Sequence, residues 1–217
     1  MPAHPNMPSE LLAVRDRWSD SLSKLNADND RIEYIRNELS ALLFNRAIFF
    51  KLLTNIVKGS RYPNIRQAQM FEDEILLCLN PQPIFSIRMF IYQPGDYTPI
   101  HDHNSWAVIG SALGQIGVTN YAREDDGSIE GYARLYETGQ KVLERGQTDV
   151  NFPLNAGIHQ TGNPSGHTSI MVSVYGRPIR RIYINRFDLE NHTVYRMYSS
   201  QMKKRMLAAK ALKNIEE

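Results

Sequence analysis

The sequence contains a single cysteine, Cys78, in 217 residues. One cysteine excludes an internal disulfide framework and favours a reducing compartment. Long apolar runs are also missing, because none approaches the ~20 residues of a membrane-spanning helix. Residues 1–10 carry three prolines and lack the apolar core of a signal peptide. We therefore expect a soluble, cytoplasmic protein that does not enter a membrane.

Charge of either sign is nearly balanced, with 25 basic and 23 acidic residues and a formal net charge of +2. Such a chain has no strong positive field, so nucleic acid is not an expected partner. The length of 217 residues and the 42% hydrophobic content suit one well-buried core. We expect a single domain over residues 1–217, and the sequence leaves its oligomeric state unknown.

The N-terminal part has a helical pattern. Apolar residues recur at three- and four-residue steps through residues 9–59, as on one face of a helix. We expect two or three helices there, with Asp28 or Asp30 as the N-cap of the second. Asn45 is placed to cap a third helix, which Gly59 would end at its C′ position. Residues 1–70 are therefore predicted to be a helical extension.

From about residue 74 the apolar period falls to two, and turn residues become frequent. Many short strands without intervening helices indicate a mainly β barrel or sandwich over residues 71–198. A terminal helix is expected over residues 199–217. The predicted strands are 75–79, 84–92, 106–113, 115–122, 132–137, 148–152, 158–162, 168–175, 181–185 and 194–198.

A candidate metal site lies in the stretch from Gly95 to Gly114. His101 and His103 are separated by one residue, so on a strand both imidazoles face the same way while Asp102 points to the other side. A third histidine, His159, follows a Pro/Asn/Gly-rich turn and can enter a strand that faces the first pair. These three residues are the predicted metal ligands.

The glycines around these histidines resemble the two motifs of the cupin superfamily. Gly95, His101, His103 and Gly114 fit the first motif, with Ala107 in the position that is usually glutamate. The second motif is similar to the run Gly146, Pro153, His159 and Asn163, with a one-residue shift. The resemblance implies a cupin double-stranded β-helix, a jelly-roll-like barrel.

Within that superfamily, residues 71–188 are similar to the thiol dioxygenases, which include cysteine dioxygenase and 3-mercaptopropionate dioxygenase. The run His-Asp-His-x-x-Trp and the strand that ends at Tyr175 carry this resemblance. It implies an oxidoreductase that uses O2 to convert a small thiol into its sulfinate. Imidazole ligands suit several metals, so Fe(II) is implied by the family resemblance alone.

Further roles follow from the same resemblance. Tyr175 would act catalytically as a hydrogen-bond donor, although it could also be a core residue. Trp106 matches a family tryptophan and is a candidate for substrate binding, with a structural role in the barrel wall as the alternative. Arg181 is the candidate for binding a substrate carboxylate, with a surface salt bridge as the alternative.

The chain also departs from the family pattern. Met171 and Ser173 occupy the positions of the serine and histidine that usually form a relay to the tyrosine. Ala107 occupies the position of the cysteine that cross-links to tyrosine in animal cysteine dioxygenases, so we expect no link between Tyr175 and Cys78. Glu74 lies near the position of an arginine in cysteine dioxygenases, and we expect it to be an exposed residue at the start of a strand.

Two other classes of function stay open on the sequence. One is a different metal-dependent cupin enzyme, such as an isomerase or lyase that uses Tyr175 as acid or base. The other is a cupin that binds a metal or small ligand without catalysis. If Glu74 faced the metal, an aminothiol substrate such as cysteamine would be favoured over a thiol carboxylate.

Overall fold

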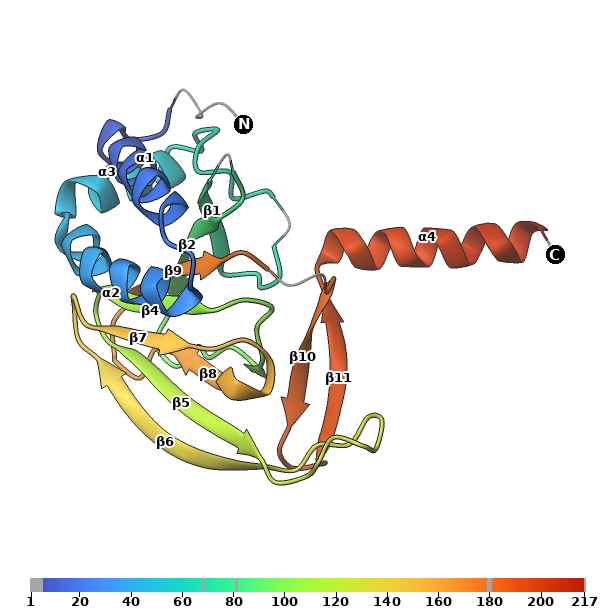
Figure 1. Ribbon diagram of the computed structural model, residues 1–217. Helices are drawn as coiled ribbons and strands as arrows, with labels where there is room; N and C mark the ends of the chain where they lie inside the picture. Colours follow the sequence, from blue (N-terminus) through green and yellow to red (C-terminus); the bar gives the residue numbers. More distant parts are fainter. Residues whose placement is uncertain (1–5, 68, 81, 179–180, 217) are drawn as a thin grey trace.

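Two antiparallel sheets form a sandwich in the computed structural model, which describes residues 6–67, 69–80, 82–178 and 181–216 (Figure 1). One sheet has the strand order β1-β2-β9-β4-β7 and the other the order β11-β10-β3-β8-β5-β6. The strands are β1 Glu74–Leu79, β2 Phe85–Tyr92, β3 Ile100–His101, β4 Ala107–Leu113, β5 Ile116–Arg123, β6 Leu135–Leu143, β7 Thr148–Asn151, β8 Ile158–Gly162, β9 Ser169–Gly176, β10 Tyr183–Asp188 and β11 Thr193–Tyr198.

Three helices precede the sheets, as predicted: α1 Ser9–Ser23, α2 Asp28–Phe44 and α3 Arg46–Val57. The side chain of Asn45 accepts a hydrogen bond from the backbone N–H of Ile48 at 3.2 Å, so it caps α3 as expected. Gly59 follows this helix with a φ of 65°, a backbone conformation that glycine adopts without steric cost. The predicted cap of α2 is wrong, because its N-cap position is Ala27.

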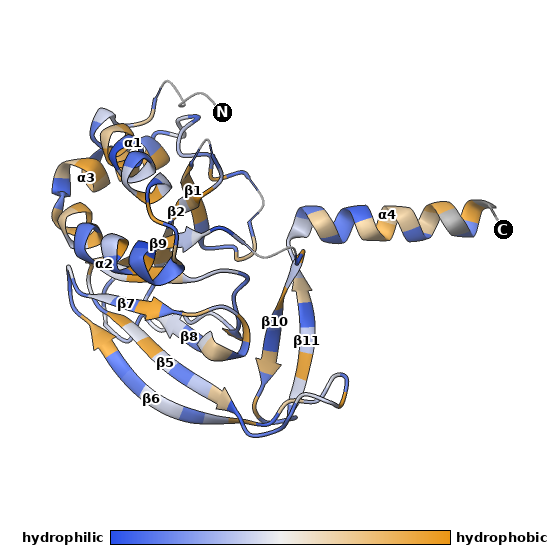
Figure 2. Cartoon of the chain, viewed as in Figure 1, coloured by the Kyte–Doolittle hydropathy of each residue, from blue (hydrophilic) through white to orange (hydrophobic). Residues whose placement is uncertain are grey.

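The five-stranded sheet is buried on both faces, because its strands alternate between two cores. On β2, Ile87 and Met89 pack against the helices, while Phe90 and Tyr92 point between the two sheets. Figure 2 shows hydrophobic residues gathered where α1–α3 meet β1 and β2. The helices therefore cover the outer face of this sheet and leave its inner face to the barrel interior.

The strand order and the two packed antiparallel sheets confirm the predicted mainly β fold, a double-stranded β-helix with helices at both ends. The bounds of several strands differ from the sequence prediction, and β10, predicted over residues 181–185, covers Tyr183–Asp188. Strand β6 runs to Leu143 and is longer than the predicted 132–137 segment. The His-x-His segment contributes only the two-residue strand β3, which ends at His101.

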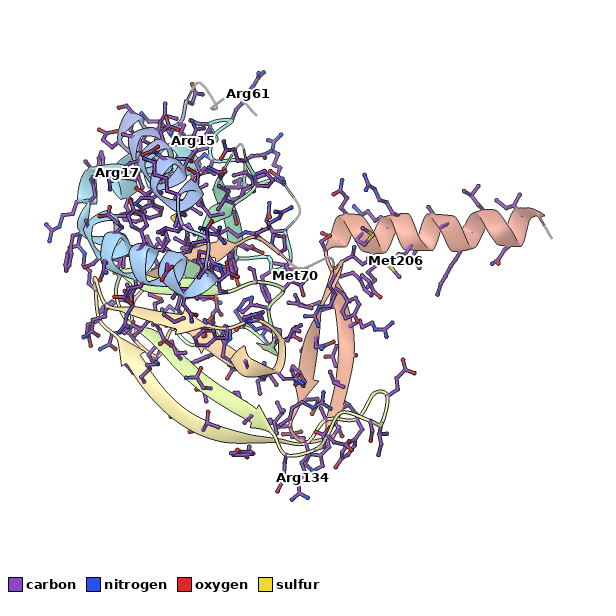
Figure 3. The ribbon with its side chains drawn as sticks, in the orientation of Figure 1. Arg15, Arg17, Arg61, Met70, Arg134 and Met206 are labelled. Carbon is purple, nitrogen blue, oxygen red and sulfur yellow. The ribbon has the colours of Figure 1, made fainter. Side chains whose placement is uncertain are left out.

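The C-terminal helix α4, Ser200–Glu216, extends away from the sandwich (Figure 1). Figure 3 shows side chains filling the space between α1–α3 and the sheets, whereas Met206 on α4 lies outside the main body. Among the described residues, no single helix is long and apolar enough to cross a membrane. The helices α2 and α3 satisfy that criterion only as a pair, and they are bent by 68° at their junction.

The packing of α2 on β4 generates a testable prediction about Gly110. A Cβ atom at this position would lie 2.5 Å from Leu43 Cδ1 and 2.8 Å from the carbonyl oxygen of Gln147. We expect Gly110→Ala to lower the free energy of unfolding by about 1–3 kcal/mol through overpacking. Gly139→Ala in β6 is the matched control, since a Cβ there meets nothing within 4 Å. Chemical denaturation that gave both variants equal stability would contradict this account.

Candidate metal centre

The three predicted histidines converge inside the barrel. His101 ends β3 and lies directly opposite His159 of β8 in the antiparallel ladder, so both rings point to the same face of the sheet. His103 lies beyond the end of β3, yet its ring centroid is 4.8 Å from that of His101 and 4.7 Å from that of His159. Ligand atoms of all three residues lie within 4.8 Å of one another.

Backbone carbonyls fix the orientation of two of the rings. Nδ1 of His101 lies 2.8 Å from the carbonyl oxygen of Pro99, and Nδ1 of His159 lies 2.8 Å from that of Gly157. A carbonyl oxygen can only accept, so each Nδ1 carries the proton and leaves Nε2 with a free lone pair. Gly157 is required here because a Cβ would lie 1.9 Å from the carbonyl oxygen of Phe152.

Burial keeps the imidazoles uncharged. Desolvation is the main cause that lowers the pKa of His101 to about 3 and that of His159 to about 4, and it also lowers the pKa of His103. Neutral imidazole is the form that binds a metal. The Nε2 atoms of His103 and His159 are 3.2 Å apart, a separation that suits two nitrogens each about 2.1 Å from one ion. The residues therefore fit a metal held by three histidines.

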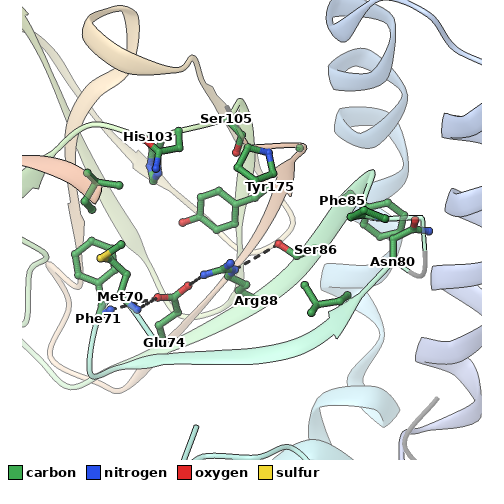
Figure 4. Close-up of a pocket in the computed structure, with 16 residues that line it drawn as sticks. Met70, Phe71, Glu74, Asn80, Phe85, Ser86, Arg88, His103, Ser105 and Tyr175 are labelled. Carbon is green, nitrogen blue, oxygen red and sulfur yellow. Dashed lines mark hydrogen bonds and ion pairs between the residues drawn. The ribbon is translucent and has the colours of Figure 1, made fainter. Parts of the chain in front are cut away.

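A cavity of about 480 Å³ opens beside this centre. Figure 4 shows the Tyr175 ring between His103 and an ion pair formed by Arg88 and Glu74. The ring centroid of Tyr175 is 5.2 Å from that of His103, and the guanidinium carbon of Arg88 is 5.1 Å from the Tyr175 ring. The apolar part of the wall includes Met70, Phe71, Phe85 and Ile184.

Glu74 is a buried residue, so the expectation of an exposed carboxylate is wrong. One carboxylate oxygen accepts a hydrogen bond from Nη1 of Arg88. The other accepts from the backbone N–H groups of Met70 at 3.0 Å and Phe71 at 3.2 Å. Nε of Arg88 donates to the hydroxyl of Ser86, so Glu74 and Ser86 together fix the guanidinium. Its Nη2 donates to none of the described residues.

Tyr175 faces the barrel interior with a protonated hydroxyl. Burial is the main cause that raises its pKa, and the nearby Glu74 carboxylate raises it further, against an opposing effect of Arg88. Ser173 lies two residues earlier on the same face of β9, and its buried hydroxyl beside Tyr175 opposes the rise in the pKa of Tyr175. Met171 belongs to the apolar core between the sheets. A Ser–His relay to Tyr175 is therefore not formed by these positions.

The structure places the other predicted residues away from the cavity. Trp106 belongs to the core that faces the helices, and its ring covers Gly176 so closely that a Cβ there would lie 2.2 Å from it. Arg181 forms an ion pair with Asp102 at 2.6 Å. Neither residue is among those that line the cavity. The Arg181–Asp102 pair is largely buried, so it is not the surface salt bridge that the sequence left as the alternative.

Cys78 lies in the helix-facing core, whereas Tyr175 packs against the apolar core between the two sheets. The two side chains are therefore on opposite faces of the five-stranded sheet. The absence of a cross-link between them stays a prediction.

Arg88 is the residue that sequence reasoning missed. It is the one charged residue in the strand Phe85-Ser-Ile-Arg-Met-Phe-Ile-Tyr92, and alternation places it on the same face as Phe90 and Tyr92, toward the barrel interior. A lone arginine in an otherwise apolar strand was the available signal.

No family model matches the sequence. Among solved structures, similarity is found to an oxalate oxidase in complex with the substrate analogue glycolate, at 22% identity over 43% of this chain and 42% of that chain, with a TM-score of 0.34. A sugar phosphate isomerase from a cupin superfamily of Silicibacter pomeroyi matches at 15% identity over 64% of this chain and 84% of that chain, with a TM-score of 0.37. A Cupin 2 conserved barrel domain protein from Salinispora arenicola matches at 16% identity over 54% of this chain and 86% of that chain, with a TM-score of 0.36.

The latter two neighbours are described as cupin proteins, and the strand order of this chain is by itself that of two packed antiparallel sheets. The match spans less than half of the oxalate oxidase. At these identities and scores, the neighbours do not inform the reaction. What the chain itself contains is a cluster of three histidines that could hold a metal ion.

The convergence of the histidines predicts the behaviour of His159→Ala. Losing one of three ligands should lower the content of bound divalent metal sharply, because affinity depends on the complete set of nitrogens. Elemental analysis after purification measures this, and His167→Ala is the control at a loop histidine that lies outside the cluster. Full metal content in His159→Ala would exclude this residue as a ligand.

The lowered pKa values predict how the stability of the metal-free protein depends on pH. Below about pH 6.5, His159 binds a proton in the unfolded chain but stays neutral in the folded chain until about pH 4. The free energy of unfolding therefore falls as the pH is lowered toward 4. For His159 alone the loss is on the order of 3 kcal/mol. Thermal melts of His159→Gln should show a shallower dependence on pH than melts of the wild type, and parallel curves would contradict this.

Proposed function

We propose that the chain is an iron-dependent thiol dioxygenase that acts on a small thiol carboxylate. The observation that carries this proposal is a set of three neutral histidines without a carboxylate ligand, beside a cavity that contains a protonated tyrosine and a partly unengaged arginine. The overall reaction is R–SH + O2 → R–SO2H. Both oxygen atoms join the sulfur, which is oxidised while O2 is reduced, so no other reductant is needed.

The charge of the ligand set supports an anionic sulfur ligand. Three neutral imidazoles leave the full positive charge of a divalent ion uncompensated, whereas a carboxylate would partly neutralise it. Ala107 supplies no ligand atom in the position that is usually glutamate. When bound, Fe(II) would lower the pKa of the thiol and supply the centre at which sulfur and O2 react. The remaining steps depend on the residues of the cavity.

Arg88 is the proposed anchor for the substrate carboxylate. Its guanidinium stays charged, because the carboxylate of Glu74 opposes the effect of burial and the net shift raises its pKa. The contacts with Glu74 and Ser86 fix the plane of the guanidinium, so Nη2 can donate a charge-assisted hydrogen bond without first being ordered. A carboxylate bound there would hold the thiol end of a short substrate toward His103, which lines the same cavity.

Glu74 argues against an aminothiol as the preferred substrate. Its oxygens are already used by Arg88 and by two backbone N–H groups, so it has little capacity left for a substrate ammonium group. The pair also adds no net negative charge to the cavity. We therefore place 3-mercaptopropionate or a similar thiol carboxylate ahead of cysteamine.

Tyr175 is the proposed hydrogen-bond donor to the reacting atoms. A phenol that stays protonated can donate to the substrate sulfur or to an oxygen that develops negative charge. The surrounding apolar residues exclude water, which strengthens this bond. A cytoplasmic location would supply both the small thiol and the reducing conditions that keep it free.

Oxygen uptake with a panel of thiols tests the function. The iron-loaded protein should consume O2 with 3-mercaptopropionate and release one sulfinate per O2, as measured with an oxygen electrode and mass spectrometry. Tight metal binding without O2 uptake would instead support an isomerase, a lyase or a non-catalytic metal-binding cupin.

Arg88→Met should raise KM for 3-mercaptopropionate by roughly 10–100-fold, because a charge-assisted hydrogen bond contributes about 1.5–3 kcal/mol. Cysteamine has no carboxylate, so its kinetics should change much less. The substitution leaves the buried Glu74 carboxylate without its cation, and Glu74→Gln combined with Arg88→Met removes that secondary effect. Equal losses with both substrates would show that Arg88 does not bind the carboxylate.

Tyr175→Phe should keep the metal but lower kcat by about 10–1000-fold, the range found for donors that stabilise developing negative charge. Metal content and kcat are measured on the same preparation. An unchanged kcat would leave Tyr175 with a packing role only.

A further inference from the structure

His103 lies outside the strand that holds His101, and among the described residues its own backbone makes one hydrogen bond, in which its carbonyl oxygen accepts from the N–H of Leu154 at 2.9 Å. His101 of β3 pairs with His159 of β8 in the antiparallel ladder, but β3 ends before His103. Strand pairing therefore does not explain why the His103 ring stays in the cluster. Besides the bond from Leu154, the hydrogen bonds that hold this turn are made by the neighbouring residues Asp102 and Asn104.

Asp102 and Asn104 are attached to the segment from Arg181 to Asn185. The Asp102 carboxylate is fully buried and accepts hydrogen bonds from Nη2 of Arg181 at 2.6 Å, from the backbone N–H of Asn185 at 2.7 Å and from Nδ2 of Asn185 at 2.9 Å. The backbone N–H of Asp102 donates to the carbonyl oxygen of Asn185 at 3.1 Å. Within the described part of the chain, the hydrogen bonds to this carboxylate therefore come from Arg181 and Asn185.

Arg181 also reaches the other side of His103. Its Nε donates to Oδ1 of Asn104 at 2.5 Å, and Nδ2 of Asn104 donates to the carbonyl oxygens of Arg181 and Tyr183, each at 2.9 Å. One guanidinium thus contacts the residue before His103 and the residue after it. Asp102 points to Arg181 and Asn185 while the ring of the next residue, His103, lies in the cluster, so fixing the Asp102 side chain limits where His103 can point.

We propose that Arg181 is a positioning residue for the metal centre and not a ligand for the substrate carboxylate. Through Asp102 and Asn104, it holds His103 in the orientation that completes the three-histidine cluster. This proposal rests on the cluster as a metal site and does not depend on the thiol dioxygenase reaction. If Arg181 is removed, Asp102 becomes a buried charge without its cation, and the turn that carries His103 is free to rearrange.

The test measures the affinity of the protein for Co(II) by calorimetry and by the visible absorption of the bound ion. Arg181→Met should weaken Co(II) binding by about 10–100-fold, the effect expected for a residue that orients a metal ligand. Asp102→Asn should also weaken binding. In the double variant the two losses should be less than additive, because no unpaired charge remains when both partners are replaced.

Arg196→Met is the matched control. The guanidinium carbons of Arg196 and Arg181 each lie 4.9 Å from the centroid of the Tyr183 ring, but Arg196 makes no hydrogen bond to Asp102 or Asn104 in the described structure. Co(II) affinity should therefore be unchanged in Arg196→Met. Arg181→Lys keeps the charge but loses the forked contact, so its affinity should fall between those of the wild type and Arg181→Met.

A purely structural effect and a substrate-binding role give different results. Loss of stability alone would lower the melting temperature but leave the Co(II) affinity and spectrum of the folded protein unchanged. Substrate binding by Arg181 would raise KM for 3-mercaptopropionate and not for cysteamine, again with wild-type Co(II) affinity. Either result, or additive losses in the double variant, would overturn the proposal. If Arg181→Met does not fold, Arg181→Lys carries the same comparison.

Discussion

The structure depends on keeping three imidazoles uncharged and directed toward one point in a dry interior. Burial alone would satisfy the first condition, since it lowers the pKa of His101 and His159 well below neutrality. Direction requires hydrogen bonds, and the carbonyl oxygens of Pro99 and Gly157 supply them by holding each Nδ1 proton. The lone pairs of the Nε2 atoms are then the only ring positions left for a metal.

This requirement explains why the site lies where the two sheets meet. Strand β3 is too short to carry both His101 and His103, so the second histidine relies on side-chain contacts made by its neighbours. The alternation that turns both rings inward also turns Asp102 outward, and there it meets Arg181 and Asn185. A carboxylate that would be costly to bury alone becomes an attachment point when it accepts this many hydrogen bonds.

A second buried ion pair, between Arg88 and Glu74, has a different position and a different consequence. Glu74 uses its second oxygen to accept from the backbone of residues 70 and 71, so the loop before β1 is attached to the wall of the cavity. The pair introduces polarity beside the metal centre without introducing net charge. Its partly unengaged guanidinium is then the group best placed to recognise an anion, while Tyr175 remains a neutral donor between it and His103.

The sequence by itself determined the local structure and identified the three histidines that cluster in the barrel. Period-three and period-two apolar patterns predicted the helices and most of the strands, because each pattern reflects how successive side chains leave the backbone. The one-residue spacing of His101 and His103, with His159 after a turn that requires Gly157, was sufficient to predict the cluster. The helices, the strands and the His101–His103 spacing depend on neighbours within a few residues along the chain, whereas the place of His159 opposite His101 depends on the pairing of β3 with β8.

Only the tertiary structure decided which charged groups reach the cavity. Strand β2 directs Arg88 into the barrel, whereas Arg181 forms an ion pair with Asp102, which lies 79 positions earlier in the chain. Glu74 is buried because β2 brings Arg88 beside it, and Trp106 belongs to the helix-facing core because Gly176 leaves room for its ring. Such partners lie on different strands. The alternation of side chains along one strand shows which residues share a face, but not which residues of other strands that face contacts.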